Sequence, residues 1–191
     1  QRGQVEITRI APPTPAGLLE PDQIAEALAD RPARLVALVH ASNVVGSVQP
    51  ITEIGRAVRD AGSLFLVDAA QSIGTVPIDV TADCIDLLAY PGHKALQGPP
   101  GTGGLWVGPR AKDLIQPSIR EGGTGGDSEY PTQPPVWPHW LEAGTHNTAG
   151  VAALGVGLEW IRQQGGVAKL LEHERAQGAT GPAGHGRTVG R

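Results

Sequence analysis

Three short polar motifs follow apolar runs that have the length of a β-strand. They are HASN at 40–43, DAAQ at 68–71 and GHK at 92–94. Between them they carry an amine, a carboxylate, imidazoles and side-chain amides, which are groups that can bind a charged organic cofactor or substrate. Because polar groups at the carboxyl ends of strands gather at one edge of an α/β sheet, we expect the three motifs to form one site.

Asp68 and Lys94 carry the two charges of these motifs. Asp68 closes an apolar strand, where a buried carboxylate is costly unless a cation meets it; a protonated pyridine ring is such a cation. Lys94 is expected in a turn, and a lysine that reacts as a free amine must be partly desolvated. Each residue alone has a simpler explanation, Asp68 as the cap of a turn and Lys94 as a surface charge. Spacing by itself does not choose between these interpretations.

The elements that position these motifs alternate between helix and strand. A helix is predicted at 21–30, with a proline in its first turn. The continuous apolar run at 35–40 is typical of a strand covered on both faces. The remaining pattern predicts further elements, namely strands at 64–68, 85–90 and 104–108 and helices at 51–62 and 149–164. We therefore expect an α/β fold with a central, mostly parallel sheet flanked by helices.

The bulk composition excludes several classes of protein. The chain has 191 residues, 40% of them hydrophobic, and can bury one globular core. Its net charge of −4 comes from scattered residues without a basic stripe, so nucleic acid is not an expected partner. No apolar stretch has the length of a membrane span or the pattern of a secretion signal. The single cysteine, Cys84, excludes a disulfide framework, so a cytoplasmic location is expected.

Two segments are unlike the rest of the chain. The stretch 121–138 is rich in glycine and proline and is predicted to be an extended surface loop. The tail from Gln177 lacks apolar periodicity and is predicted to be disordered. Neither segment is expected to contribute a helix or a strand.

The sequence resembles a known family over most of its length. The stretches 40–80 and 85–108 resemble, almost without gaps, the central part of the class V aminotransferase and cysteine desulfurase family. EGGTGGDSEY and LEAGTHNTAGVAALGVGLEW resemble the next two blocks, so the similarity covers roughly residues 5–175. The resemblance implies the large domain of a fold type I enzyme that depends on pyridoxal phosphate (PLP), truncated at both ends. Residues 1–170 would form its central part, and residues 171–191 a helix end and a disordered tail.

The resemblance also implies a role for each polar residue of the three motifs. Asp68 would pair with the pyridine nitrogen of PLP, and Gln71 would approach its phenolic oxygen. His93 would contact the phosphate. Lys94 would form the Schiff base with the cofactor aldehyde and would then act as the catalytic acid and base.

The same resemblance implies a substrate and partners. Asn43 would lie near the cofactor ring and the substrate carboxylate, and Thr145 would reach the phosphate bound by the neighbouring subunit of a homodimer. The substrate would be an amino acid, with cysteine converted to alanine and persulfide sulfur that passes to a sulfur-acceptor protein. Class V transamination is an alternative reaction. A catalytically incomplete remnant that keeps the fold without turnover is another alternative.

Several positions depart from the family pattern. Pro91 stands where members usually have a serine or threonine whose hydroxyl binds the phosphate, and His146 replaces a usual proline. The arginine that members carry just before EAGT is replaced around Trp140. Cys84 does not match the persulfide cysteine and is expected to be a buried thiol. The N-terminal phosphate loop and the C-terminal substrate-binding arginine of the family are expected to lie outside this chain.

Two patterns imitate functional motifs. GPPGTGG at 98–104 resembles a nucleotide-binding loop, but Gly104 and Leu105 stand in place of its lysine and its serine or threonine. We therefore expect this loop to shape the turn after Lys94. Four histidines lack the spacing of metal ligands and are expected in surface or capping roles, so no metal site is predicted; they are His139, His146, His173 and His185.

Overall fold

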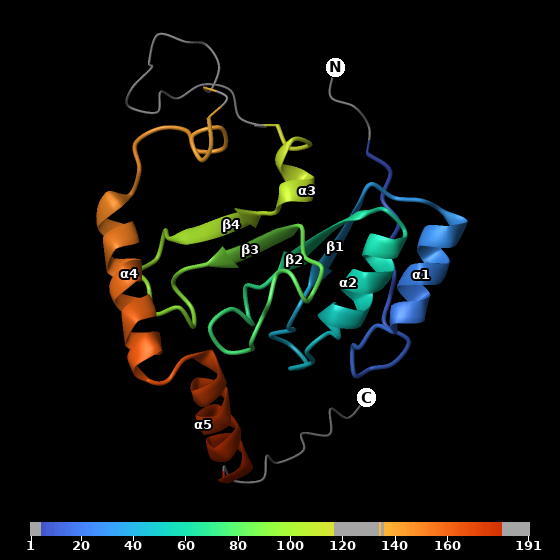
Figure 1. Ribbon diagram of the computed structural model, residues 1–191. Helices are drawn as coiled ribbons and strands as arrows, with labels where there is room; N and C mark the ends of the chain where they lie inside the picture. The colour runs from blue at the N-terminus through green and yellow to red at the C-terminus, as the bar shows by residue number, and fades with distance from the viewer. Residues whose placement is uncertain (1–4, 117–133, 135, 181–191) are drawn as a thin grey trace, which may run out of the picture.

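The computed structural model describes residues 5–116, 134 and 136–180 of the chain. A helix precedes each of the first two strands, two more strands follow without a described helix between them, and two longer helices come after the sheet (Figure 1). The elements are α1 (Pro21–Asp30), β1 (Leu35–Val39), α2 (Ile51–Asp60), β2 (Leu64–Asp68), β3 (Leu87–Pro91), β4 (Gly103–Val107), α3 (Pro109–Lys112), α4 (Thr148–Gln163) and α5 (Val167–Thr180). None of the described helices is long and apolar enough to cross a membrane.

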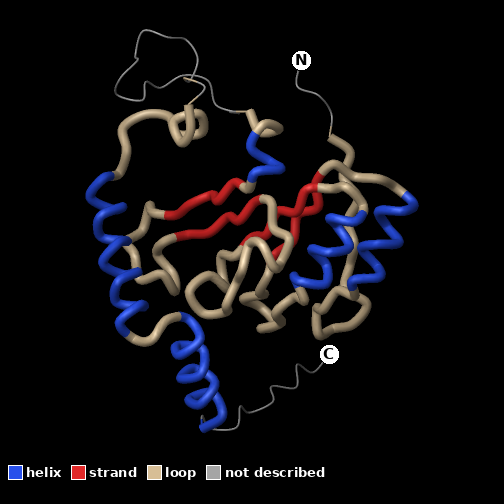
Figure 2. Tube along the Cα trace, in the orientation of Figure 1, coloured by secondary structure: helices blue, strands red, loops and turns tan. Residues whose placement is uncertain are grey.

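Four strands form one sheet in the order β1-β2-β3-β4. The first three strands are parallel, and β4 runs antiparallel to β3. Figure 2 shows these strands side by side, with helices at the two ends of the sheet. The predicted mostly parallel sheet with flanking helices is therefore confirmed. The parallel register matters for function, because it brings the carboxyl ends of β1, β2 and β3 to the same edge.

One face of the sheet packs against α1 and α2. In α2 the buried side chains recur at intervals of three and four residues, as a helix lying on a sheet requires. Ile54 and Val58 of this helix are fully buried, as are Phe65 and Val67 of β2. These four residues belong to a single hydrophobic cluster. This core holds the sheet flat against its helices and fixes where the strands end.

The exposure of one face of β1 contradicts one prediction from the sequence. The run at 35–40 was expected to be covered on both faces, but Leu35 is 44% exposed and Val39 is 53% exposed. Their neighbours Val36 and Leu38 pack against the core. The reason is that β1 is the outermost strand of the described sheet. An apolar run does not show where its strand lies in the sheet, so it did not reveal that one face of β1 is uncovered.

Two predicted boundaries also differ from the structure. β3 begins at Leu87, two residues later than expected. The tail predicted to be disordered from Gln177 instead continues as helix α5 to Thr180. The same helix crosses the predicted division between residues 170 and 171, and that division stays a prediction. Residues 121–133 of the predicted loop and 181–191 of the predicted tail lie outside the described residues.

An ion pair between the buried Asp86 and the partly exposed Arg110 lies at the end of the sheet opposite the strand carboxyl ends. Asp86 is 2% exposed, and its Oδ2 accepts hydrogen bonds from the Phe65 backbone at 2.9 Å and from Arg110 Nη1 at 3.1 Å. Arg110 Nη2 also donates to the Ser63 carbonyl at 3.1 Å. One guanidinium thus joins helix α3 to the segments that precede β2 and β3.

Replacement of Arg110 by methionine is expected to lower the free energy of unfolding by about 1–3 kcal/mol, because the buried Asp86 carboxylate loses a charged donor. Urea unfolding followed by circular dichroism measures this change. Lys112→Met is the matched control, since it removes an exposed cation from the same short helix; its effect is expected to stay within about 0.5 kcal/mol. Equal effects of the two substitutions would contradict a bracing role for Arg110.

Candidate functional site

The carboxyl ends of β1, β2 and β3 lie next to one another. Val39 pairs with Asp68 in the register of the sheet, and Asp68 pairs with Ala89. The hydrogen bonds continue one step beyond the strands, because the His40 amide donates to the Asp68 carbonyl and the Ala69 amide donates to the Ala89 carbonyl, each at 2.9 Å. The loops that carry the three polar motifs therefore leave the sheet at one edge.

His40 is a structural residue of this edge that the sequence analysis did not single out. Its side chain is 2% exposed, and Nδ1 lies 2.9 Å from Ser72 Oγ, which is itself fully buried. Burial lowers the pKa of His40 below 6.5, although the nearby carboxylate of Asp83 acts in the opposite direction. A neutral imidazole thus ties the end of β1 to the loop that follows β2. Its position in HASN was visible in the sequence, but its partner 32 residues away was not.

Asp68 caps the turn that follows its strand and keeps part of its carboxylate available. Oδ1 accepts a hydrogen bond from the Ala70 amide at 2.9 Å, which is the simpler role considered for this residue. Among the described residues, Oδ2 has no hydrogen-bond donor. The side chain is half-buried. Both roles are therefore compatible, since one oxygen orients the carboxylate while the other can meet a cation.

The loops after β2 and β3 are in direct contact. Gly74 has a φ of +84°, and a Cβ atom placed on it would lie 3.0 Å from the carbonyl carbon and oxygen of Ala95. A residue with a side chain would be strained in its backbone and crowded by the neighbouring loop. Through this contact the segment with Asp68 and Gln71 lies against the segment with Lys94.

Hydrogen bonds close the turn that carries Lys94. The Gln97 amide donates to the Lys94 carbonyl at 3.0 Å, and the Gly98 amide donates to the Gly92 carbonyl at 2.8 Å. The Gly92 amide in turn donates to the Thr102 carbonyl at 2.7 Å. The loop 98–104 therefore closes this turn and leads into strand β4, whereas a nucleotide-binding loop would open a helix. The structural role predicted for it is confirmed.

Helix α4 packs on the outside of the same turn, as Figure 1 shows. A Cβ atom on Gly157 would lie 2.5 Å from the Leu96 carbonyl oxygen, and one on Gly98 would lie 2.6 Å from Leu154 Cδ1. Helix and turn are thus close enough that glycine is required on both sides. The backbone around Lys94 is fixed by its own hydrogen bonds and by this helix.

The predicted site residues differ in their exposure. Lys94 and His93 are exposed, and Gln71 is half-buried. Asn43 is exposed in the turn after β1, where Ser42 Oγ accepts hydrogen bonds from the Val44 and Val45 amides at 3.2 and 3.3 Å. The partial desolvation expected for Lys94 is not provided by the described residues.

Thr145 is exposed in the turn just before α4, and no hydrogen bond within the described part of the chain links it to the other predicted site residues. Its turn reaches the loop that follows Lys94, because Asn147 Nδ2 donates to the Gly101 carbonyl at 3.4 Å. Pro91 occupies the last position of β3, opposite Gly103, and offers no hydroxyl group there. The described structure thus brings together the loops of Asp68, Gln71, His93 and Lys94, with Asn43 on the adjoining loop.

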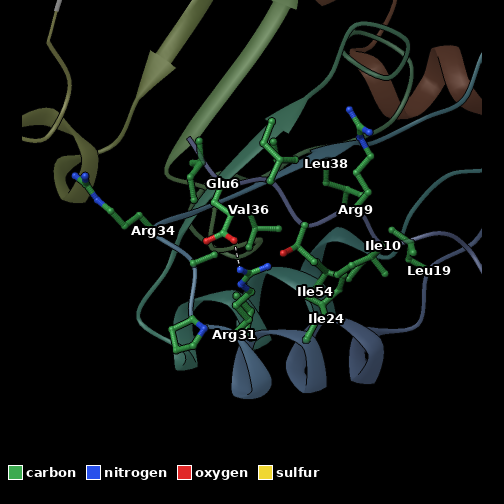
Figure 3. A pocket seen from close by; sticks show the side chains of 18 of the residues that line it. Glu6, Arg9, Ile10, Leu19, Ile24, Arg31, Arg34, Val36, Leu38 and Ile54 are labelled. Carbon is green, nitrogen blue, oxygen red and sulfur yellow. Dashed lines mark hydrogen bonds and ion pairs between the residues drawn. The ribbon is translucent and has the colours of Figure 1, made fainter. Parts of the chain in front are cut away.

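A cavity of about 950 Å³ lies elsewhere, along the outer edge of β1 (Figure 3). Its walls come from residues 5–10, from 19–39 with helix α1 and strand β1, and from Ile54. An ion pair between Glu6 and Arg31 crosses it. Since these walls belong to β1 and the segments before it, the cavity is separate from the loops after β2 and β3.

Two histidines lie close together in the segment before α4. Surface or capping roles were expected for His139 and His146, and their ring centroids are 6.0 Å from each other. Glu142 lies with them, and one possible ligand atom from each of the three residues lies within 4.8 Å of the others. Sequence spacing missed this cluster because the chain between residues 136 and 147 folds into successive turns.

The close packing of α4 on the Lys94 turn leads to a stability prediction. Gly157→Ala is expected to destabilise the chain by about 1–3 kcal/mol, because the new methyl group would meet the Leu96 carbonyl oxygen. Gly155→Ala in the same helix has open space and is expected to stabilise by up to about 1 kcal/mol. Urea unfolding measures both. If the two substitutions changed the free energy of unfolding by the same sign and size, the result would contradict the proposed helix-to-turn contact.

The lowered pKa of His40 leads to a prediction of pH dependence. As the pH falls through 6.5, the unfolded state binds a proton before the folded state does, so the free energy of unfolding decreases. His40→Gln lacks this proton site. The wild-type free energy of unfolding is therefore expected to exceed that of His40→Gln by less at about pH 5.5 than at about pH 8. The change is expected to be at most about 1.4 kcal/mol per pH unit. Urea titrations at the two pH values measure it, and a constant difference would show that His40 is not responsible.

Comparisons with known proteins agree with this arrangement. The chain is 39% identical over 166 residues to a probable cysteine desulfurase from Methanothermobacter thermautotrophicus, a match that covers 86% of this chain and 41% of the relative. The structure resembles that of a cysteine desulfurase from Thermococcus onnurineus NA1, with a TM-score of 0.73, 30% identity, and coverage of 90% of this chain and 43% of that chain. It also resembles an alanine–glyoxylate aminotransferase from Nostoc sp., at a TM-score of 0.68, with 85% of this chain and 43% of that chain covered. At 24% identity, that last likeness shows the fold alone.

The chain thus spans about two fifths of the length of the cysteine desulfurase relative from Methanothermobacter thermautotrophicus. Its residues 1–180 match the family model described as Aminotransferase class-V. The resemblance inferred from the three motifs is confirmed by this match and by the desulfurase relatives. The chain belongs to the class V aminotransferase family of PLP-dependent enzymes.

Proposed function

We propose that this chain carries the cofactor-binding core of a cysteine desulfurase, which converts cysteine to alanine and releases its sulfur as a persulfide. One observation carries the proposal: the loop with Asp68 and the loop with Lys94 leave one sheet edge and touch at Gly74 and Ala95. The 39% identical desulfurase relative supports this reaction over class V transamination.

The residues present fit PLP. A half-buried carboxylate with one oxygen that has no donor among the described residues suits the protonated nitrogen of a pyridine ring. The exposed Lys94 amine, on a turn held in place by backbone hydrogen bonds, is accessible to an aldehyde. Pro91 is the one position that fits less well, since it withholds a phosphate ligand. The phosphate would depend more on His93 and on groups outside the described loops.

When bound, PLP supplies an electron sink for the carbanion that forms at the substrate Cα. Asp68 keeps a proton on the ring nitrogen, and Gln71 donates to the phenolic oxygen. Lys94 would hold the cofactor aldehyde, and its amine would carry the proton to and from the substrate Cα. Asn43 orients the ring and the substrate carboxylate from the adjoining loop.

The thiol that accepts the sulfur of the substrate is not that of Cys84. In desulfuration the C–S bond of cysteine breaks, and the sulfur joins a cysteine thiolate as a persulfide, which requires an accessible nucleophile. Cys84 is the single cysteine of this chain and is buried beside its own loop, at 4.0 Å from the Ala82 carbonyl oxygen. The thiol that accepts the sulfur is therefore supplied by another polypeptide segment or by a sulfur-acceptor protein.

The proposal includes assembly and location. Thr145, exposed in the turn just before α4, serves the phosphate of a neighbouring subunit in a homodimer. A cytoplasmic location is supported by the absence of any need for disulfides in a chain with one cysteine. A remnant that binds PLP without turnover is the alternative, favoured by the exposure of Lys94.

Mixing the purified chain with PLP is expected to produce a visible absorbance band that is lost in Lys94→Ala. Borohydride reduction is expected to fix the cofactor on Lys94, located by peptide mass spectrometry. Asp68→Ala is expected to weaken PLP binding by about tenfold or more, because the ring nitrogen loses its counter-charge. Lys112→Ala, which removes an exposed lysine far along the chain, should leave the band unchanged.

Absence of a band and of a reduced adduct that depend on Lys94 would contradict PLP binding by this chain. Incubation of the loaded chain with cysteine and dithiothreitol, whose thiols accept the sulfur and reduce it to sulfide, then separates the two functions. Alanine and sulfide production supports desulfuration. A band that depends on Lys94 with no alanine released supports the non-catalytic alternative.

A further inference from the structure

A cluster of metal-ligating side chains lies outside the proposed cofactor site. It consists of His139, Glu142 and His146, in the segment that leads into α4. One ring nitrogen or carboxylate oxygen from each residue lies within 4.8 Å of the other two, and His146 Nδ1 lies 3.6 Å from Glu142 Oε2. Two ligands of a tetrahedral zinc ion are about 3.3 Å apart, given zinc–ligand bonds of about 2.0–2.1 Å. One pair is thus close to that spacing, and small side-chain rotations would bring in the third.

The ring nitrogens of this cluster are available for a ligand. His139 Nδ1 is buried and has no hydrogen-bond partner among the described residues. A buried imidazole nitrogen without a partner is costly unless something binds it. The two rings are inclined by 62°, edge to face, so they do not stack and block one another. The described residues provide no hydrogen-bond donor that would compete for these nitrogens.

The backbone around the cluster is held in place. The Glu142 amide donates to the His139 carbonyl at 3.2 Å, which places both residues on one turn. Trp140 Nε1 donates to the Ile115 carbonyl at 3.1 Å and ties the segment to the chain after α3. Asn147 Oδ1 caps α4 by accepting from the Gly150 amide at 3.0 Å. The segment is therefore anchored at Trp140, between His139 and Glu142, and again at Asn147, directly after His146.

We propose that His139, Glu142 and His146 form a site for a divalent zinc ion. Two imidazoles and one carboxylate are a ligand set that zinc accepts readily, and a hard cation such as magnesium would prefer oxygen ligands alone. The ion would fix the segment that precedes α4 and carries Thr145. Three protein ligands leave the fourth coordination position to water. This site is independent of the proposed PLP chemistry.

The test uses the 191-residue chain without a polyhistidine tag, because a tag would itself bind metal. Isothermal titration with zinc chloride is expected to show one equivalent bound. Cobalt(II) is expected to give visible d–d absorption bands of a tetrahedral site. His139→Ala, His146→Ala and Glu142→Gln are each expected to weaken zinc binding at least about tenfold. His173→Ala and Glu159→Gln, on α5 and α4, are the matched controls and should bind as wild type does.

Three results would overturn the site. One is a zinc dissociation constant above about 100 μM for the wild-type chain. Another is unchanged affinity in the three ligand variants whose circular dichroism matches wild type. The third is a thiolate-to-cobalt charge-transfer band, which would assign the metal to Cys84. Glu142→Gln preserves the shape of an exposed side chain, so a loss of binding in that variant cannot come from unfolding.

Discussion

The contact between two loops at one sheet edge is the constraint on which the candidate site depends. Parallel register brings β2 and β3 to the same edge, but adjacent strands alone do not make adjacent loops. The loops touch because Gly74 takes a left-handed conformation and presents no side chain to Ala95. A carboxylate and an amine that are 26 positions apart in the sequence are thereby carried by segments in contact.

The rest of the described fold holds this contact in place from several sides. His40, neutral because it is buried, ties the end of β1 to Ser72 in one of the two loops. Helix α4 presses on the other loop through Gly157. At the far end of the strands the buried Asp86 and the partly exposed Arg110 join α3 to the segments before β2 and β3. Lys94 is exposed, but hydrogen bonds and helix packing hold the backbone that carries it.

Part of the exposed apolar surface of the chain lies along strand β1. Leu35 and Val39 of the outermost strand are exposed, and a cavity runs along the outer side of the same strand. These surfaces are places where the described part of the fold makes few contacts, and Lys94 is exposed as well. The chain corresponds to about two fifths of the Methanothermobacter desulfurase relative.

The sequence by itself determined the order of most strands and helices, the family, and the loops at the sheet edge that carry Asp68, Gln71, His93 and Lys94. Hydrophobic runs such as 64–68 and motifs such as DAAQ are local, and local patterns are readable without coordinates. Only the tertiary structure decided that β1 has an uncovered face, that His40 bonds Ser72, and that His139 meets His146. Each of these depends on a neighbour distant in the chain or on a turn whose path the residue types do not fix. Burial and side-chain contact are properties of the packed fold, and spacing along the chain does not encode them.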